Sequence, residues 1–298
     1  MLLNRLNTLR LIHPPPWLPS TTHYLCTMGS VAYGVAGDDS DCDVYGFCIP
    51  PKEMIFPHLT GEIAGFGRQI KRFEQWQEHH INDHEAGKEY DLQIYNIIKY
   101  FQLCMENNPN MVDALFVPER CVIHCSAVGN IVRENRKLFL HRGCWHKFRG
   151  YAYSQLHKMS IKTPDVGSKR AEYVDKYGFD VKFAYHVVRL IYEVEQILTT
   201  GDLNIESNSE TLKAIRRGEW TEQRVIEFFQ QKESALNKAY EESKLPYSPD
   251  ETKIKKILLQ ALEHHFGTLD GAYVEPDRYR KALVEIQNIC IGLQLHKS

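Results

Sequence analysis

Two aspartates stand two positions apart early in the chain, shortly after a Gly-Ser pair. Asp41 and Asp43 lie in DCDVYGF, and ten residues separate Asp41 from the pair formed by Gly29 and Ser30. On a β-strand, residues two apart point to the same face, so the two carboxylates would lie side by side. Like charges at that distance repel each other, and a cation between them removes the repulsion. The aspartates therefore predict a site for a divalent metal ion.

The metal expected there is Mg²⁺ or Mn²⁺. Mg²⁺ binds oxygen ligands, usually one or two carboxylates together with substrate phosphates. Two such ions roughly 3.5–4 Å apart stabilise the attacking and leaving oxygens of a phosphoryl displacement, and such a site usually has a third carboxylate. Asp91 is the candidate, because it lies in KEYDLQIY, a second segment with strand-like alternation. We expect Asp41, Asp43 and Asp91 to be both metal ligands and catalytic residues.

The Gly-Ser pair suits the same chemistry, because a helical turn that opens after a strand presents free backbone N–H groups. These groups point outward and can hold phosphate oxygens. Gly29 would let the backbone approach a phosphate closely, and the hydroxyl of Ser30 adds a donor. The sequence therefore predicts that a metal held by the aspartates meets the phosphates of a nucleoside triphosphate.

The composition is that of an ordinary globular protein. The chain has 298 residues, 43% of them hydrophobic and 25% charged, which is enough for two domains with a sizeable core. The net charge of −2 gives no sign of a nucleic-acid or membrane partner. The eight cysteines form no CxxC pair, which is typical of reduced thiols in a cytoplasmic protein. No segment has the ~20 apolar residues of a membrane span, and the N-terminus lacks the apolar stretch of a signal peptide.

Alternating hydrophobicity predicts strands in the first third of the chain, and helical periodicity predicts helices after about residue 125. The polar stretch 61–88 is expected to be a long loop, and Asn96 is expected to cap a helix. We therefore expect one domain over residues 1–125, combining strands and helices, and an all-helical domain over residues 126–298. The predicted strands are TTHYLCTMGS, DCDVYGFCIP and KEYDLQIY, and the predicted helices include HKFRGYAYSQLHKM, FDVKFAYHVVRLIYEVEQIL, TEQRVIEFFQQKESALNKAYEE and a last one over about 276–294.

Basic residues in the helical part are candidates for phosphate binding. Lys182, His186 and Arg189 follow one another at helical spacing, and they form either a row of three potential cations facing a cleft or a solvated helix face. Lys158 begins a second basic stretch, which is either a phosphate- or RNA-binding loop or a solvated linker. His79, His80 and His84 are interpreted as part of an exposed loop, and Trp145, Tyr151 and Tyr153 as core residues rather than a base-stacking surface.

The segment GSVAYGVAGDDSDCD resembles the signature of the DNA polymerase β-like nucleotidyltransferase superfamily. The resemblance implies that Asp41, Asp43 and Asp91 bind divalent metal and that Gly29 with Ser30 binds the triphosphate. Ser40, directly before the first aspartate, also fits the pattern. The implied fold is an α/β (α+β) palm with a mixed sheet, followed by an all-helical C-terminal domain.

The chain further resembles one branch, the predicted nucleotidyltransferases associated with RNA ligases (the YcgL-like or RlaP group). The likeness covers residues 28 to about 200 and implies that Lys158, Lys182, His186 and Arg189 contact the nucleotide. It also implies transfer of a nucleoside monophosphate to an RNA end, in repair or tailing, with release of pyrophosphate. The motifs that carry it are GSVAYGVAGDDSDCDVYG, NNPNMVDALFVP, KFRGYAYSQLHKM and KYGFDVKFAYHVVRL.

Three other functions are open at this point. The first is transfer of AMP to a protein, as in toxin–antitoxin pairs. The second is binding of nucleotide or RNA without turnover, which three intact carboxylates disfavour. The third is a glycosyltransferase with an Asp-x-Asp motif, which the preceding Gly-Ser pair disfavours.

Overall fold

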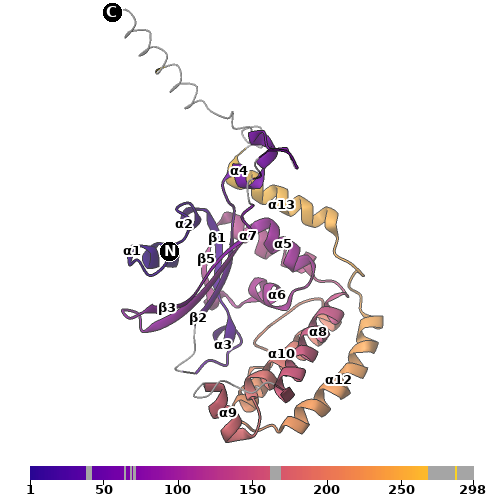
Figure 1. Cartoon of the computed structure of the whole chain (residues 1–298). Coiled ribbons are helices and arrows are strands. Elements are labelled where there is room, and N and C mark those ends of the chain that lie inside the picture. Colours follow the sequence, from indigo (N-terminus) through magenta and orange to yellow (C-terminus); the bar gives the residue numbers. More distant parts are fainter. Residues whose placement is uncertain are drawn as a thin grey trace, which may run out of the picture. The chain divides into compact units, whose positions relative to one another are not determined.

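The computed structural model describes residues 1–37, 42–63, 65–67, 69, 72–161, 169–267 and 286 (Figure 1). The chain divides into two compact units, one formed by residues 1–49 and 74–261 and the other by residues 50–73 and 262–298. In the second unit, Lys52 Nζ lies 5.6 Å from the ring centroid of Phe266. All described residues of the predicted site belong to the first unit. The boundary expected at residue 125 stays a prediction.

The first unit contains a mixed five-stranded sheet in the order β3-β4-β2-β1-β5. β2 and β4 are parallel, and the other neighbours are antiparallel. The mixed α/β fold and the three predicted strands are therefore confirmed. The strands are β1 (Thr22–Thr27), β2 (Cys42–Cys48), β3 (Gln75–Asp83), β4 (Lys88–Asn96) and β5 (Val122–Cys125).

The prediction of a long loop over residues 61–88 is wrong for Gln75–Asp83, which form β3. Its sequence, QWQEHHIND, is almost entirely polar, and most of its residues are exposed or half-buried. It lies at the edge of the sheet and pairs only with β4. Polar edge strands bury little apolar surface and therefore lack the hydrophobic alternation that marks a strand in the sequence.

Helices α5 and α6 pack against the sheet through contacts with β1 and β2. Asn96 caps α5 as predicted, because its side chain accepts a hydrogen bond of 3.0 Å from the backbone N–H of Ile98. The ring of Phe47 in β2 lies 5.1 Å from that of Tyr100 in α5. The hydroxyl of Tyr24 in β1 donates to the carbonyl of Ala114 in α6 over 2.6 Å. These buried aromatic contacts fix both helices on the sheet.

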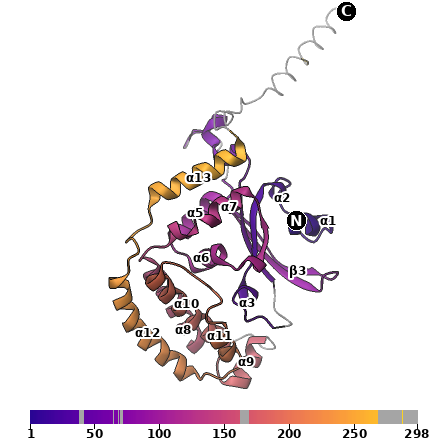
Figure 2. The ribbon, with the colours of Figure 1, turned by 180° about the vertical axis from the view of Figure 1, so that it is seen from behind.

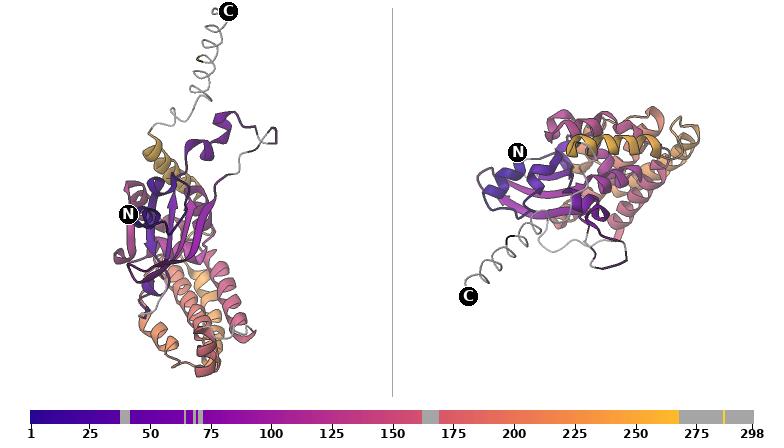
Figure 3. Two further views of the ribbon diagram at one scale, coloured as in Figure 1. Left: turned by 60° about the vertical axis from the view of Figure 1, so that its left-hand side comes forward. Right: turned by 90° about the horizontal axis from the view of Figure 1, so that it is seen from above.

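The chain after residue 125 is helical in its described part, as predicted (Figure 2). α8, α10 and α12 pack against one another, and the pink and orange helices gather together in both views of Figure 3. The predicted helix over 276–294 lies, apart from residue 286, outside the described residues. The helices are α1 (Leu2–Thr8), α2 (Leu18–Thr21), α3 (Gly29–Ala32), α4 (Lys52–Ile55), α5 (Ile97–Met105), α6 (Pro109–Phe116), α7 (Ala127–Glu134), α8 (Cys144–Ile161), α9 (Lys169–Tyr177), α10 (Val181–Thr200), α11 (Ser209–Arg216), α12 (Glu222–Glu242) and α13 (Glu251–Phe266), with 3-10 turns η1 (Pro57–Thr60), η2 (Glu119–Cys121) and η3 (Arg136–Phe139).

Helix α10 has clear start and stop signals. Asp180 caps its first turn by accepting a hydrogen bond of 2.8 Å from the backbone N–H of Lys182. Gly201 ends it in the left-handed conformation, with φ of 66°. Within the described part of the chain, no helix combines the length and the apolar character that crossing a membrane requires.

Candidate active site

The Gly-Ser turn lies directly against the second aspartate of the Asp-x-Asp pair. α3 is a single turn that opens at Gly29, and the backbone N–H of Met28 donates to the carbonyl of Asp43 over 2.7 Å. Gly29 has a φ of 66°, which L side chains rarely adopt. A Cβ atom there would overlap Oδ2 of Asp43. Glycine is therefore required twice, by the backbone conformation and by the carboxylate beside it.

Asp43 and Asp91 are direct partners on neighbouring strands. In the parallel pairing of β2 and β4, the Cα atom of Asp43 is registered with that of Asp91. Paired residues on adjacent strands point to the same face, so both carboxylates lie on one face of the sheet. The structure thus brings together two of the three predicted metal ligands. Asp41 and Ser40 lie outside the described residues.

A β-bulge in the edge strand holds one oxygen of Asp91. Between the pairs Glu78–Leu92 and Ile81–Tyr90, β3 advances by three residues and β4 by two, so β3 carries one extra residue. His80 lies in this bulge with a φ of 56°, and its backbone N–H donates to Asp91 Oδ1 over 2.8 Å. His79 Nδ1 lies 3.5 Å from the same oxygen. Asp91 therefore enters the site with one oxygen already held by the protein.

This role of the two histidines does not follow from the sequence. Their segment is expected to be an exposed loop, because a bulge interrupts the alternation that would reveal the strand. The available signal was only indirect: two adjacent histidines in a polar stretch shortly before the alternating segment that contains Asp91.

Tyr45 lies close enough to the two aspartates to be affected by their charges. Tyr45 lies two residues after Asp43 and therefore points to the same face. Burial raises the pKa of its hydroxyl above the usual value, and the charges of Asp43 and Asp91 raise it further. The Tyr45 hydroxyl stays protonated at neutral pH, and the carboxylates that disfavour its ionisation would favour a cation.

Arg189 is not on an exposed stripe but in a buried network. Its Nη1 donates to Asp113 Oδ2 in α6, to Glu193 Oε1 over 3.0 Å, and to the hydroxyl of Tyr33 over 2.7 Å. The Tyr33 hydroxyl in turn donates to Asp113 Oδ2 over 2.7 Å. Arg189 is 5% exposed and Asp113 is fully buried. Because Tyr33 directly follows α3, the network joins α10 and α6 to the Gly-Ser turn.

Neither a row of three cations facing a cleft nor a solvated helix face describes this part of α10, because Arg189 is buried. The charge of Arg189 is compensated by two buried carboxylates. Burial and the positive charges of Arg189 and Lys182 lower the pKa of His186 well below its usual range, so this imidazole is neutral at pH 7. Of these three described side chains, only Lys182 keeps an exposed positive charge. Contact of any of the three with a nucleotide stays a prediction.

Lys158 lies near the end of α8. It lines a groove of about 440 Å³ together with other residues of the same helix. Within the described ranges, which omit Asp41, no group of three or more His, Cys, Asp or Glu side chains is arranged to hold a metal ion.

Comparison with known proteins identifies the family. No curated protein matches the chain. A crystal structure of a nucleotidyltransferase-like protein from Exiguobacterium sibiricum is 12% identical with a TM-score of 0.29, over 91% of this chain and 75% of that one. The model of the family RlaP, described as the RNA repair pathway DNA polymerase beta family, matches residues 17–268. The resemblance inferred from the motifs is thereby confirmed: the chain belongs to the RlaP family and is a nucleotidyltransferase of the polymerase β-like kind.

Proposed function

We propose that the chain uses a divalent metal to transfer a nucleoside monophosphate from a triphosphate to a hydroxyl at an RNA end, with release of pyrophosphate. The observation that carries the proposal is the registered pair of Asp43 and Asp91, with the Gly-Ser turn directly against Asp43. Two carboxylates on neighbouring strands, next to the first turn of a helix, suit a metal-bound triphosphate. The family supports the RNA substrate, since it is described as an RNA repair family.

The donor atoms fit Mg²⁺ or Mn²⁺. Carboxylate oxygens are the ligands that these hard ions prefer, and the missing side chain of Gly29 lets Asp43 Oδ2 lie directly against the Gly-Ser turn. Asp43 and Asp91 would hold the metal, with Asp41 as the third ligand by its spacing. When bound, the metal would supply Lewis-acid stabilisation of the charge that develops on phosphate oxygens.

Other residues of the chain would bind and orient the substrates. The backbone and hydroxyl of Gly29 and Ser30 would hold the terminal phosphates, with Ser40 nearby in sequence. Lys182 would add positive charge, and neutral His186 would add a hydrogen bond. Arg189 would act by holding the turn in place through Tyr33.

The reaction would be an in-line displacement at the α-phosphorus. The acceptor hydroxyl oxygen forms the new bond while the bond to the pyrophosphate oxygen breaks, and the hydroxyl proton is lost to the solvent. Residues 1–125 would act as the palm and residues 126–298 as the helical domain, with the nucleotide bound where α10 meets the Gly-Ser turn.

The test is transfer of label from each α-³²P nucleoside triphosphate, with Mg²⁺ or Mn²⁺, to short RNAs and to total cellular protein. Label in RNA that depends on metal supports the proposal and identifies the base. Label in protein alone would contradict transfer to RNA and support transfer of AMP to protein instead. Folded protein that transfers no label to any acceptor would contradict it.

The backbone conformation of the bulge in β3 is expected to affect the affinity for Mn²⁺. His80→Val should weaken Mn²⁺ binding about tenfold, because a β-branched residue disfavours the left-handed backbone that aims the N–H at Asp91. His80→Gly keeps this conformation and the N–H, so its Mn²⁺ affinity should stay within about twofold of wild type. Both variants lose the ion pair of the His80 ring with Glu89, which makes them matched controls. Electron paramagnetic resonance of free Mn²⁺ measures the affinity, and equal affinities of the two variants would refute the role of the bulge.

A further inference from the structure

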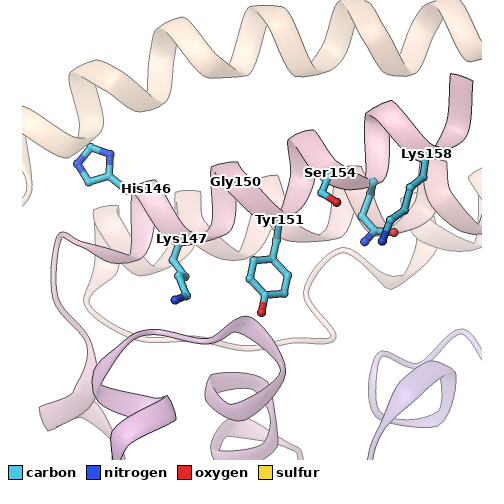
Figure 4. Close-up of a pocket in the computed structure, with 7 residues that line it drawn as sticks. His146, Lys147, Gly150, Tyr151, Ser154 and Lys158 are labelled. Atoms are coloured by element: carbon cyan, nitrogen blue, oxygen red, sulfur yellow. The ribbon is translucent and has the colours of Figure 1, made fainter. Parts of the chain in front are cut away.

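One face of α8 forms a groove that the site described above does not use. Lys147, Tyr151, Ser154 and Lys158 follow each other at helical spacing, so they lie along one face of the helix. Figure 4 shows the side chains of Lys147, Tyr151 and Lys158 on the same side of α8. The volume of about 440 Å³ is in the range of pockets that bind organic ligands.

Gly150 lies in this groove and has no structural reason to be glycine. It occupies the interior of an 18-residue helix, where glycine is less favourable than alanine. Its backbone is not in the left-handed region. A Cβ atom there would meet nothing within 4 Å. A glycine that weakens its helix, and whose missing side chain avoids no steric clash, is expected where a ligand approaches the backbone.

The groove lies on the side of the sheet that carries the aspartates. The Tyr151 hydroxyl accepts a hydrogen bond of 3.1 Å from Asn108 Nδ2, at the start of α6. Tyr151 also contributes to raising the pKa of Tyr95 in β4 to about 12, after the larger effect of burial. Tyr95 is four residues beyond Asp91 and on the same face, about 13 Å along the strand. The groove and the carboxylates therefore lie on the same side of the sheet.

The side chains of the groove suit a single-stranded polynucleotide. Lys147 and Lys158 are eleven residues apart, about 16 Å along the helix axis, which distributes positive charge along the groove as a polynucleotide backbone requires. Tyr151 lies between them and, contrary to its interpretation as a core residue, is 36% exposed, so it offers an aromatic face on which a base can stack. The hydroxyl of Ser154 can hydrogen-bond a ribose 2′-OH. Glu106 Oε2, 3.5 Å from Lys147 Nζ, is the acidic group at one end of the groove.

We propose that this groove on α8 binds a short stretch of single-stranded RNA and holds the acceptor strand of the transfer reaction. The proposal rests on the proposed function for the role of the strand, but the binding itself can be measured without catalysis. Gly150 provides the floor, Tyr151 the stacking surface, and Lys147 and Lys158 the contacts to phosphates.

The first experiment measures binding of a fluorescein-labelled hexamer of single-stranded RNA to the full-length chain by anisotropy, without nucleoside triphosphate. Tyr151→Leu and the double variant Lys147→Gln/Lys158→Gln should each bind about tenfold more weakly. Gly150→Gln should bind at least fivefold more weakly and yet unfold at a higher temperature, because it fills the groove and improves the helix. Lys238→Gln, on the exposed face of α12, is the control and should bind like wild type.

Loss of affinity together with gain of stability in Gly150→Gln is the result that a purely structural role would not produce. Unchanged RNA binding in Tyr151→Leu and in the double lysine variant would overturn the proposal, and so would a wild-type chain that binds no RNA. The proposal would also be overturned if the groove variants bound a fluorescent ATP analogue more weakly and bound RNA like wild type. The groove would then be a nucleotide pocket. Equal competition by a DNA hexamer of the same sequence would overturn the choice of RNA.

A second readout separates this proposal from the proposed function. If the groove variants weaken RNA binding but wild type transfers no label to RNA, the RNA-binding role of the groove is supported and the proposed reaction is refuted. Label transfer with a wild-type KM for RNA in all groove variants would support the reaction and refute the groove. If both hold, the groove variants should raise the KM for RNA about tenfold and leave the KM for the triphosphate unchanged.

Discussion

Asp43→Asn is expected to lower nucleotide transfer by at least about a thousandfold while the chain stays folded. Asparagine has nearly the same shape but no charge, so it cannot compensate a divalent ion beside Asp91. A loss of about 4 kcal/mol of transition-state stabilisation corresponds to this factor. Single-turnover transfer of label from an α-³²P triphosphate at saturating metal measures the effect. Residual activity above a tenth of wild type would contradict the assignment of Asp43.

The control for Asp43→Asn is Asp175→Asn, which removes an exposed carboxylate from α9. It changes the net charge equally and should transfer label like wild type. Asp91→Asn should resemble Asp43→Asn, because the two residues are registered partners. Direct Mn²⁺ binding should weaken in both, and wild-type Mn²⁺ affinity in an inactive Asp43→Asn variant would assign Asp43 a role other than metal binding.

The candidate site could be predicted to the extent that it depends on local sequence. The Gly-Ser turn and the strand that carries Asp43 follow from alternation and turn chemistry within twenty residues. Asp91 was a good candidate because its segment alternates too, but its register with Asp43 depends on how the chain crosses from β2 to β4. That crossing includes β3, whose polar sequence resembles a loop. Parallel pairing between distant segments leaves no local signal.

The network around Arg189 could not be predicted for a different reason. The spacing of Lys182, His186 and Arg189 indicates a common helix face, but not what covers it. Asp113 accepts a hydrogen bond from Arg189 although it lies 76 residues earlier in the chain. It belongs to α6, whose sequence indicates only an apolar helix. Burial of an arginine is a property of the assembled fold, and it converts an expected phosphate ligand into a group that holds the Gly-Ser turn.

Arg189→Met is expected to destabilise the fold by about 3–5 kcal/mol, because it leaves two buried carboxylates without their counter-charge. The triple variant Arg189→Met/Asp113→Asn/Glu193→Gln removes all three charges and should recover most of the loss. Arg217→Met removes an exposed arginine paired with Glu219 and should change stability little. Denaturant unfolding at pH 7 measures all three, and a triple variant as unstable as the single one would refute the electrostatic origin.

The cost of Arg189→Met should also depend on pH, with a definite sign. Burial already raises the pKa of Asp113 and of Glu193 in the wild type, and Arg189 opposes this rise. Without Arg189, both pKa values in the folded state lie further above those of the unfolded chain, so folding binds protons. The variant therefore loses stability as pH rises, and its deficit relative to wild type should be larger at pH 8 than at pH 5. A deficit that shrinks with rising pH would show that the two carboxylates are not the groups that Arg189 neutralises.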